Sequence, residues 1–99
     1  MTAATLPPGL TLAIHPFSRG FGWVAFEGPF TPYDWGLSTA RRDKNAVCLR
    51  KVEKLIARLQ PETLVLEAFE RRAAARPART ARLCRALTSL AADRGLEVA

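Results

Sequence analysis

The spacing of the apolar residues changes near Asn45, and this change constrains the fold more than any other feature of the chain. Before it, short apolar or β-branched runs are separated by glycine and proline, which is typical of strands joined by tight turns. After it, apolar residues recur every three or four positions, the period of a helix buried on one face. Strands followed by alternating helix and strand indicate an α/β domain.

The first half of the chain predicts a three-stranded antiparallel meander. Its strands are expected at Leu10–Ile14, Trp23–Phe26 and Phe30–Gly36. Pro16 is expected to close the first strand, because proline has no N–H to donate to a sheet ladder. Ser18–Gly22 should supply the first turn, and Pro32 marks the third strand as an edge strand. Residues Met1–Gly9 are expected to form a flexible lead-in.

A polar connection, Leu37–Lys44, precedes the first predicted helix, which Asp43 or Asn45 should cap and Pro61 should end. Its buried stripe is Cys48, Val52, Leu55, Ile56 and Leu59. Thr63–Leu66 is continuously apolar after its first residue, as in a strand buried inside a parallel sheet.

The last quarter of the chain predicts a second helix, Arg79–Arg94, ended by Gly95. Its buried stripe is Leu83, Leu87, Leu90 and Ala91. Leu96–Ala99 reads as the start of a further strand, and Ala68–Ala78 as a basic loop or frayed helix start.

The composition bounds the function classes. The chain of 99 residues is long enough for one domain, and its net charge of +6 favours polyanions, nucleic acid above all. With one histidine and no Cys-x-x-Cys pair, a zinc site of the usual four-ligand kind is excluded. Cys48 and Cys84 fall among apolar residues and are expected to be reduced core residues. The N-terminal stretch resembles neither a signal peptide nor a membrane span, so we expect a cytoplasmic protein with no membrane partner.

Two polar residues follow apolar strands directly. His15 follows the first predicted strand and Glu67 follows Thr63–Leu66. Because these strands are joined through a helix, they should run parallel, and as neighbours they would bring His15 and Glu67 to adjacent carboxyl ends. Ligands bind at such ends in open α/β sheets.

These residues carry a resemblance. The pattern Leu-Ala-Ile-His-Pro-x-Ser-Arg-Gly-x-Gly-Trp from Leu12, then Asp34-Trp35-Gly36 and Leu64–Glu67, resembles the ribonuclease-H-like fold. Within that fold it is most similar to the Holliday-junction resolvase (RuvC-like) nucleases. The resemblance covers residues 10–99, taken as one domain that lacks the C-terminal part of the family fold. It implies a mixed sheet, a meander followed by helix, parallel strand and helix.

The resemblance also implies a metal-dependent endonuclease site. In the family, four carboxylates at the strand ends hold two divalent cations, usually Mg²⁺, which need several oxygen ligands. Glu67 matches the glutamate of the fourth strand, His15 stands in place of the first aspartate, and Phe17 stands in place of a glycine. The other acidic pair belongs to a final helix outside this sequence. We therefore expect a nucleic-acid-binding relative that is catalytically impaired alone, with Mg²⁺ or Mn²⁺ as the family's metals.

His15 and Glu67 each have a second interpretation. His15 is either a hydrogen-bonded histidine at a strand end or a functional group that contacts phosphate or a softer metal such as Mn²⁺ or Zn²⁺. Glu67 is either a partial metal ligand or the partner of a nearby arginine, and Glu70 would replace it if the register slips.

The candidate phosphate contacts are arginines, whose fork-shaped groups suit phosphate oxygens. They are Arg19, Arg71, Arg72, Arg76 and Arg79, with DNA expected in preference to RNA. The rival interpretation of the arginine run is a solvated helix face. Trp23 and Trp35 are expected in the core rather than as base-stacking platforms.

Two other functions remain open. One is a non-enzymatic module that pairs through an open sheet edge, as a homodimer or by adding a partner's strand. The other is a nuclease completed by a partner that supplies the missing carboxylates.

Overall fold

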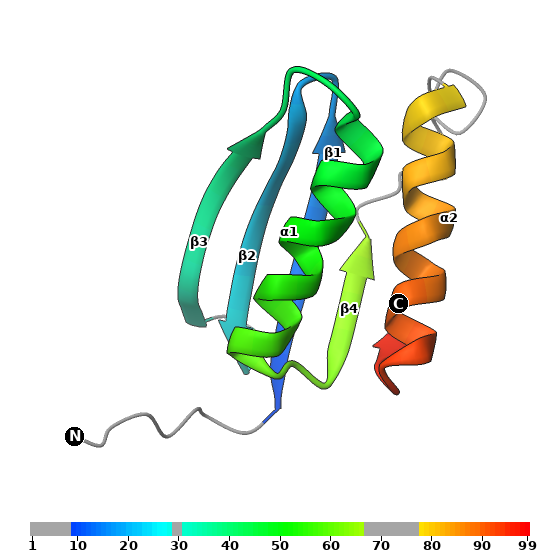
Figure 1. Ribbon diagram of the computed structural model, residues 1–99. Coiled ribbons are helices and arrows are strands. Elements are labelled where there is room, and N and C mark those ends of the chain that lie inside the picture. Colours follow the sequence, from blue (N-terminus) through cyan, green and yellow to red (C-terminus); the bar gives the residue numbers. More distant parts are fainter. Residues whose placement is uncertain (1–8, 29–30, 67–77) are drawn as a thin grey trace.

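A computed structural model describes residues 9–28, 31–66 and 78–99 of the chain. It confirms an α/β protein with a five-stranded mixed sheet and two helices (Figure 1). In chain order the elements are β1 (Leu10–Phe17), β2 (Gly20–Glu27), β3 (Thr31–Thr39), α1 (Lys44–Leu59), β4 (Thr63–Leu66), α2 (Ala78–Asp93) and β5 (Glu97–Val98).

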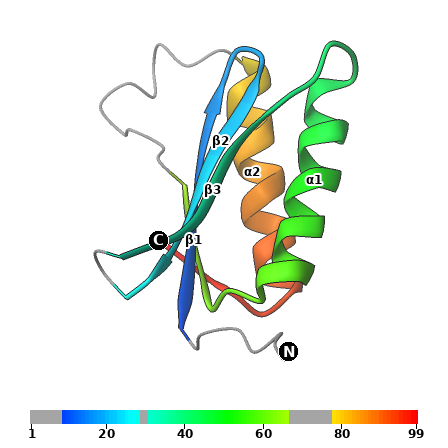
Figure 2. The same ribbon diagram turned by 90° about the vertical axis from the view of Figure 1, so that its left-hand side faces the viewer.

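The strand order is β3-β2-β1-β4-β5. β2 pairs antiparallel with both β1 and β3, as the predicted meander requires. β4 pairs parallel with β1, and Ile14 lies opposite Leu66. α1 and α2 pack on the same face of the sheet, so that neither helix covers the other face (Figure 2).

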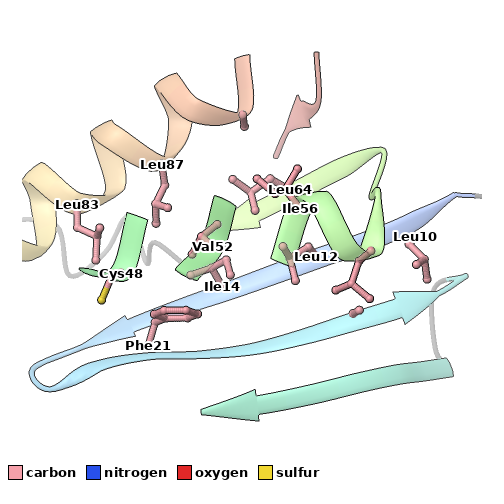
Figure 3. Close-up of a cluster of buried hydrophobic side chains, with 13 residues drawn as sticks. Leu10, Leu12, Ile14, Phe21, Cys48, Val52, Ile56, Leu64, Leu83 and Leu87 are labelled. Carbon is pink, nitrogen blue, oxygen red and sulfur yellow. The ribbon is translucent and has the colours of Figure 1, made fainter. Parts of the chain in front are cut away.

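The core lies between the sheet and the two helices (Figure 3). Alternate residues of β1 point toward the helices, and Leu10, Leu12 and Ile14 are fully buried. The helices contribute Cys48, Val52, Ile56 and Leu59 from α1, and Leu83, Leu87 and Ala91 from α2. Both predicted stripes are confirmed, with Leu55 and Leu90 partly buried at their margins.

The prediction that Pro16 closes the first strand is wrong. β1 continues to Phe17, and Pro16 is buried opposite Phe21 of β2. The pairing with β4 stops at Ile14, so Pro16 has a strand neighbour on one side only among the described strands. On the side where β4 no longer pairs with β1, a proline at this position removes no hydrogen bond between strands.

The predicted ends of the second and third strands are also wrong. The first turn is only Ser18-Arg19, and β2 begins at Gly20 rather than Trp23. β3 extends to Thr39, which shortens the predicted connection Leu37–Lys44. β3 does lie at an edge of the sheet, as Pro32 indicated. Gly20 lies within β2 rather than in the turn, and β3 passes so close to it that a side chain has no room. A Cβ at Gly20 would lie 1.9 Å from the carbonyl oxygen of Ser38.

The helices begin and end close to the predicted residues. Asp43 takes the N-cap position of α1 in the left-handed region (φ 48°) without a side-chain capping bond, and Asn45 lies inside the helix. Gln60 follows α1 with φ 49° and donates its backbone N–H to Ile56, just before Pro61. Gly95, with φ 76°, follows α2 as expected.

Two further predictions concern the cysteines and the membrane. Cys48 and Cys84 are buried free thiols, as expected for core residues. Neither described helix has the length and apolar character that crossing a membrane requires.

Candidate nucleic-acid interface

The turn between β1 and β2 is the point on which three elements converge. Lys44, at the start of α1, donates from Nζ to the carbonyl oxygen of Ser18 at 3.1 Å. Arg79, in the first turn of α2, donates from Nη2 to the carbonyl oxygens of Phe17 and Ser18 at 3.0 and 3.2 Å. The backbone N–H of Ala40 donates to the carbonyl oxygen of Arg19 at 2.9 Å. The turn therefore accepts hydrogen bonds from both helices and from the loop after β3.

Arg79 also joins the two helices. Its Nη1 donates to Oδ1 of Asn45 at 2.8 Å, and Nδ2 of Asn45 donates back to the carbonyl oxygen of Arg79 at 3.1 Å. Arg79 was predicted as a phosphate contact, but both terminal nitrogens of its guanidinium group already donate hydrogen bonds to oxygens of the protein. Its position in this interface is thus structural: it fixes the end of the sheet from which other cations project.

Charge is segregated between the two ends of the sheet. At the carboxyl end of β1 lie Arg19, Arg41, Arg42, Lys44 and Arg79, with Asp43 beside them; we call this set of cations the basic end. At the opposite end lie Glu27, paired with Leu10, and Glu97, paired with Thr63. Glu62 is held there too, because its N–H donates to the carbonyl oxygen of Leu10. We call these three glutamates the acidic end. Arg58 and Arg94, near the carboxyl ends of α1 and α2, lie toward it as well, and each is paired with a carboxylate.

A line of cations continues from the basic end along α1. Lys51, Lys54 and Arg58 border a groove of about 280 Å³ between α1 and the edge strand β3. Lys51 donates from Nζ to the carbonyl oxygen of Thr39 at 3.2 Å. Arg58 lies over the ring of Trp23, 5.7 Å from its centroid, and forms an exposed ion pair with Asp34 at 3.2 Å. Asp34 neutralises the charge of Arg58, whereas the carbonyl oxygens that accept hydrogen bonds from Lys44 and Lys51 carry no net charge. The part of this line from Lys44 to Lys54 is therefore the part that suits an external anion.

His15 lies close to where the sequence placed it. It is an exposed residue of β1, opposite Gly22, and the preceding pair across the parallel strands is Ile14 with Leu66. The described pairing of β1 with β4 therefore ends one residue before His15. Glu67 itself lies outside the described residues, as do Glu70, Arg71, Arg72 and Arg76.

The predicted metal site includes Glu67, which lies outside the described residues. Within residues 9–28, 31–66 and 78–99, no group of three or more His, Cys, Asp or Glu side chains could hold a metal ion. A single imidazole is a poor ligand for Mg²⁺, which prefers several oxygen atoms. The described residues alone do not fit the two-metal arrangement, and no catalytic step through Mg²⁺ or Mn²⁺ is derived from them.

The two tryptophans differ in their surroundings. Trp23 is partly buried, packs against the core on the helix side and carries Arg58 on its ring, in line with the prediction. The prediction for Trp35 is wrong, because its side chain is 65% exposed. It lies on the face of the sheet that neither α1 nor α2 covers, which we call the uncovered face. The sequence alternation of β3 puts Trp35 on the face opposite Asp34 and Gly36, and only the absence of a described helix there leaves it exposed.

Sequence reasoning missed the role of the loop after β3. Arg41 and Arg42 stand out only once Ala40 is seen to bond to Arg19, which brings this loop to the β1–β2 turn. The local density of positive charge at residues 41–44 was the available signal.

No family model, curated protein or solved structure matches this chain.

Proposed function

We propose that the protein binds nucleic acid through the basic end, with the phosphate backbone as the group it contacts. The observation that carries the proposal is the segregation of charge: five cations gather at one end of the sheet and three glutamates at the other. A net charge of +6 raises the affinity for any polyanion, and the segregation gives the contact a direction. Arg19, Arg41 and Arg42 are exposed and are the foremost phosphate contacts.

The fold supports a more specific form of this proposal. The strand order β3-β2-β1-β4-β5, with β1 and β4 parallel and α1 between them in the chain, agrees with the ribonuclease-H-like arrangement that the sequence resembles. The basic end coincides with the carboxyl end of β1, where the resemblance puts the reacting phosphate. We therefore propose a resolvase-like DNA-binding protein that does not cleave by itself, since His15 replaces the carboxylate that a Mg²⁺ site requires.

The test is a binding and cleavage assay on labelled four-way, duplex and single-stranded DNA, with a matched RNA duplex, in Mg²⁺ and in Mn²⁺. We expect salt-dependent binding, tightest for DNA that presents several phosphates at once, and no cleavage. Lack of binding to every substrate at low salt would overturn the proposal. Cleavage by the wild-type chain would retain the binding site but contradict the claim of impaired catalysis.

A further inference from the structure

The uncovered face of the sheet carries an apolar patch. Alternation along β1 buries Leu12 and Ile14 under the helices and turns Ala13 and His15 to the other face. The register adds Val24 and Trp35 opposite Ala13, and Gly22 and Leu37 opposite His15. These two rows line a depression of about 610 Å³, which Phe26 borders as well.

This patch is unusual in exposure and in charge. Leu37 is 77% and Trp35 65% exposed, and Tyr33 on the same strand is 41% exposed. A contiguous apolar surface of this kind on a soluble protein marks a docking site. Among the described residues that line it there is no Lys, Arg, Asp or Glu, although the whole chain has a net charge of +6.

We propose that this face binds a second copy of the same chain, so that two sheets pack face to face with their strands antiparallel. Two copies approaching through any of the cationic surfaces would repel one another, whereas the described residues that line this depression include no Lys, Arg, Asp or Glu. The register does add Glu97 to this face, at the acidic end. Two open sheets that pack in this way bury their inner faces at a separation of about 10 Å.

Charge complementarity selects the antiparallel orientation. A two-fold axis that lies in the interface and runs across the strands places the basic end of one copy over the acidic end of the other. It sets β2 against β2 in the opposite direction, so that Arg19 of each copy lies over the end of β2 that carries Glu27 in the other. The register places Glu27 on the helix side of that strand end, so the attraction acts between the two ends rather than through a direct contact. The alternative axis, along the strands, would place the two basic ends together and is disfavoured by repulsion.

The size of the face is compatible with a weak dimer. Strands β1, β2 and β3, of eight or nine residues, and the four residues of β4 cover roughly 460 Å² in projection, at about 4.8 Å spacing and about 3.3 Å rise. A stable interface buries about 800 Å² on each partner, which is more than the projected area of this face. We therefore expect a reversible, concentration-dependent dimer rather than a permanent one.

Sedimentation equilibrium of the purified chain over a wide concentration range tests the proposal. The wild type should pass from monomer to dimer, and Leu37→Glu and Trp35→Glu should each raise the dimer dissociation constant at least about 100-fold, because a carboxylate would be desolvated in an apolar contact. Both side chains are exposed, so neither substitution disturbs the core. Ala57→Glu, on the exposed side of α1, adds the same charge away from the face and should leave association unchanged.

A charge-reversal pair tests the orientation. Glu27→Lys and Arg19→Glu should each weaken the dimer about five-fold, and the double variant should restore it. A wild type that stays monomeric at every concentration overturns the proposal, and so does a dimer that Leu37→Glu leaves intact. A double variant weaker than both single variants overturns the antiparallel orientation. No nucleic acid is present in these measurements, so their outcome is independent of the nucleic-acid binding proposed above.

Discussion

At the residue scale, Arg79 and Cys48 are linked by their position beneath the basic end. Arg79 is partly buried and bonds to Phe17, Ser18 and Asn45. Cys48 is 2% exposed, and this burial raises the pKa of its thiol above the usual 9.0, an effect that the positive charges of Arg79 and Lys51 only partly offset. Both residues contribute to the stability of the fold, and a prediction about the free energy of unfolding follows for each.

Arg79→Ala should destabilise the protein by about 2 kcal/mol, because it leaves the oxygens of Asn45 and Phe17 without a charged donor. The free energy of unfolding, measured with urea, checks this. Arg82→Ala is the matched control: Arg82 is exposed on the same helix, and its loss should change stability by less than about 0.5 kcal/mol. Equal losses for the two variants would contradict the structural role of Arg79.

The Cys48 thiol should make the protein less stable at alkaline pH. The unfolded thiol ionises near pH 9.0, while the folded thiol keeps its proton to higher pH, so the unfolded state binds fewer protons in that range. The stability that the neutral thiol contributes is complete below pH 9.0 and is lost as the pH rises through the folded pKa. The difference in unfolding free energy between wild type and Cys48→Ala should therefore shrink from about pH 7 to about pH 10. A constant difference would contradict it.

At the element scale, patterns of apolar residues located the elements, while glycine and proline were misleading about where strands end. The stripes of α1 and α2 and the parallel pairing of β4 with β1 follow from periodicity and chain order. The ends of β1 and β2 do not follow from these patterns. Glycine and proline form turns, but within a strand glycine also permits a close neighbouring strand, and proline is tolerated where a hydrogen bond between strands is missing. For the proposed interface, the sequence suggested Arg19 as a contact, but no pattern in it indicated that Arg79 would donate to carbonyl oxygens of the chain.

Gly20→Ala should be strongly destabilising because the new methyl group would lie 1.9 Å from the backbone oxygen of Ser38 and 2.8 Å from the Cα of Thr39. Backbone must move to relieve this clash, at an expected cost of about 3 kcal/mol. Gly22→Ala provides a control in the same strand. Its nearest atom, 3.2 Å away, is the end of the exposed Leu37 side chain, which can rotate. Thermal unfolding should show a large loss for the first variant and less than about 1 kcal/mol for the second. Similar melting temperatures for both would show that β3 does not approach β2 so closely.

At the scale of the whole molecule, one layer of helices and a segregated charge distribution leave two surfaces for partners. The basic end suits a polyanion, and the uncovered face suits an apolar protein surface. Arg19 borders both surfaces, but a dimer would carry two basic ends at opposite sides of the assembly, each still presenting Arg41 and Arg42. Binding of nucleic acid would then involve each end separately.

The salt dependence of binding reports how many phosphates the basic end contacts. Each contact contributes about 0.9 to the slope of log affinity against log salt concentration on duplex DNA. The double variant Arg41→Ala, Arg42→Ala removes two exposed cations and should lower that slope by about 2, with a loss of affinity that is similar for unrelated sequences. Arg94→Ala is the matched control, since Arg94 follows the carboxyl end of α2 and pairs with Glu53. It removes one positive charge, against two in the double variant, and no phosphate contact, so its slope should equal that of the wild type. If Arg94→Ala lowered the slope by half as much as the double variant, the affinity would depend on net charge alone, and the basic end would not be the binding surface.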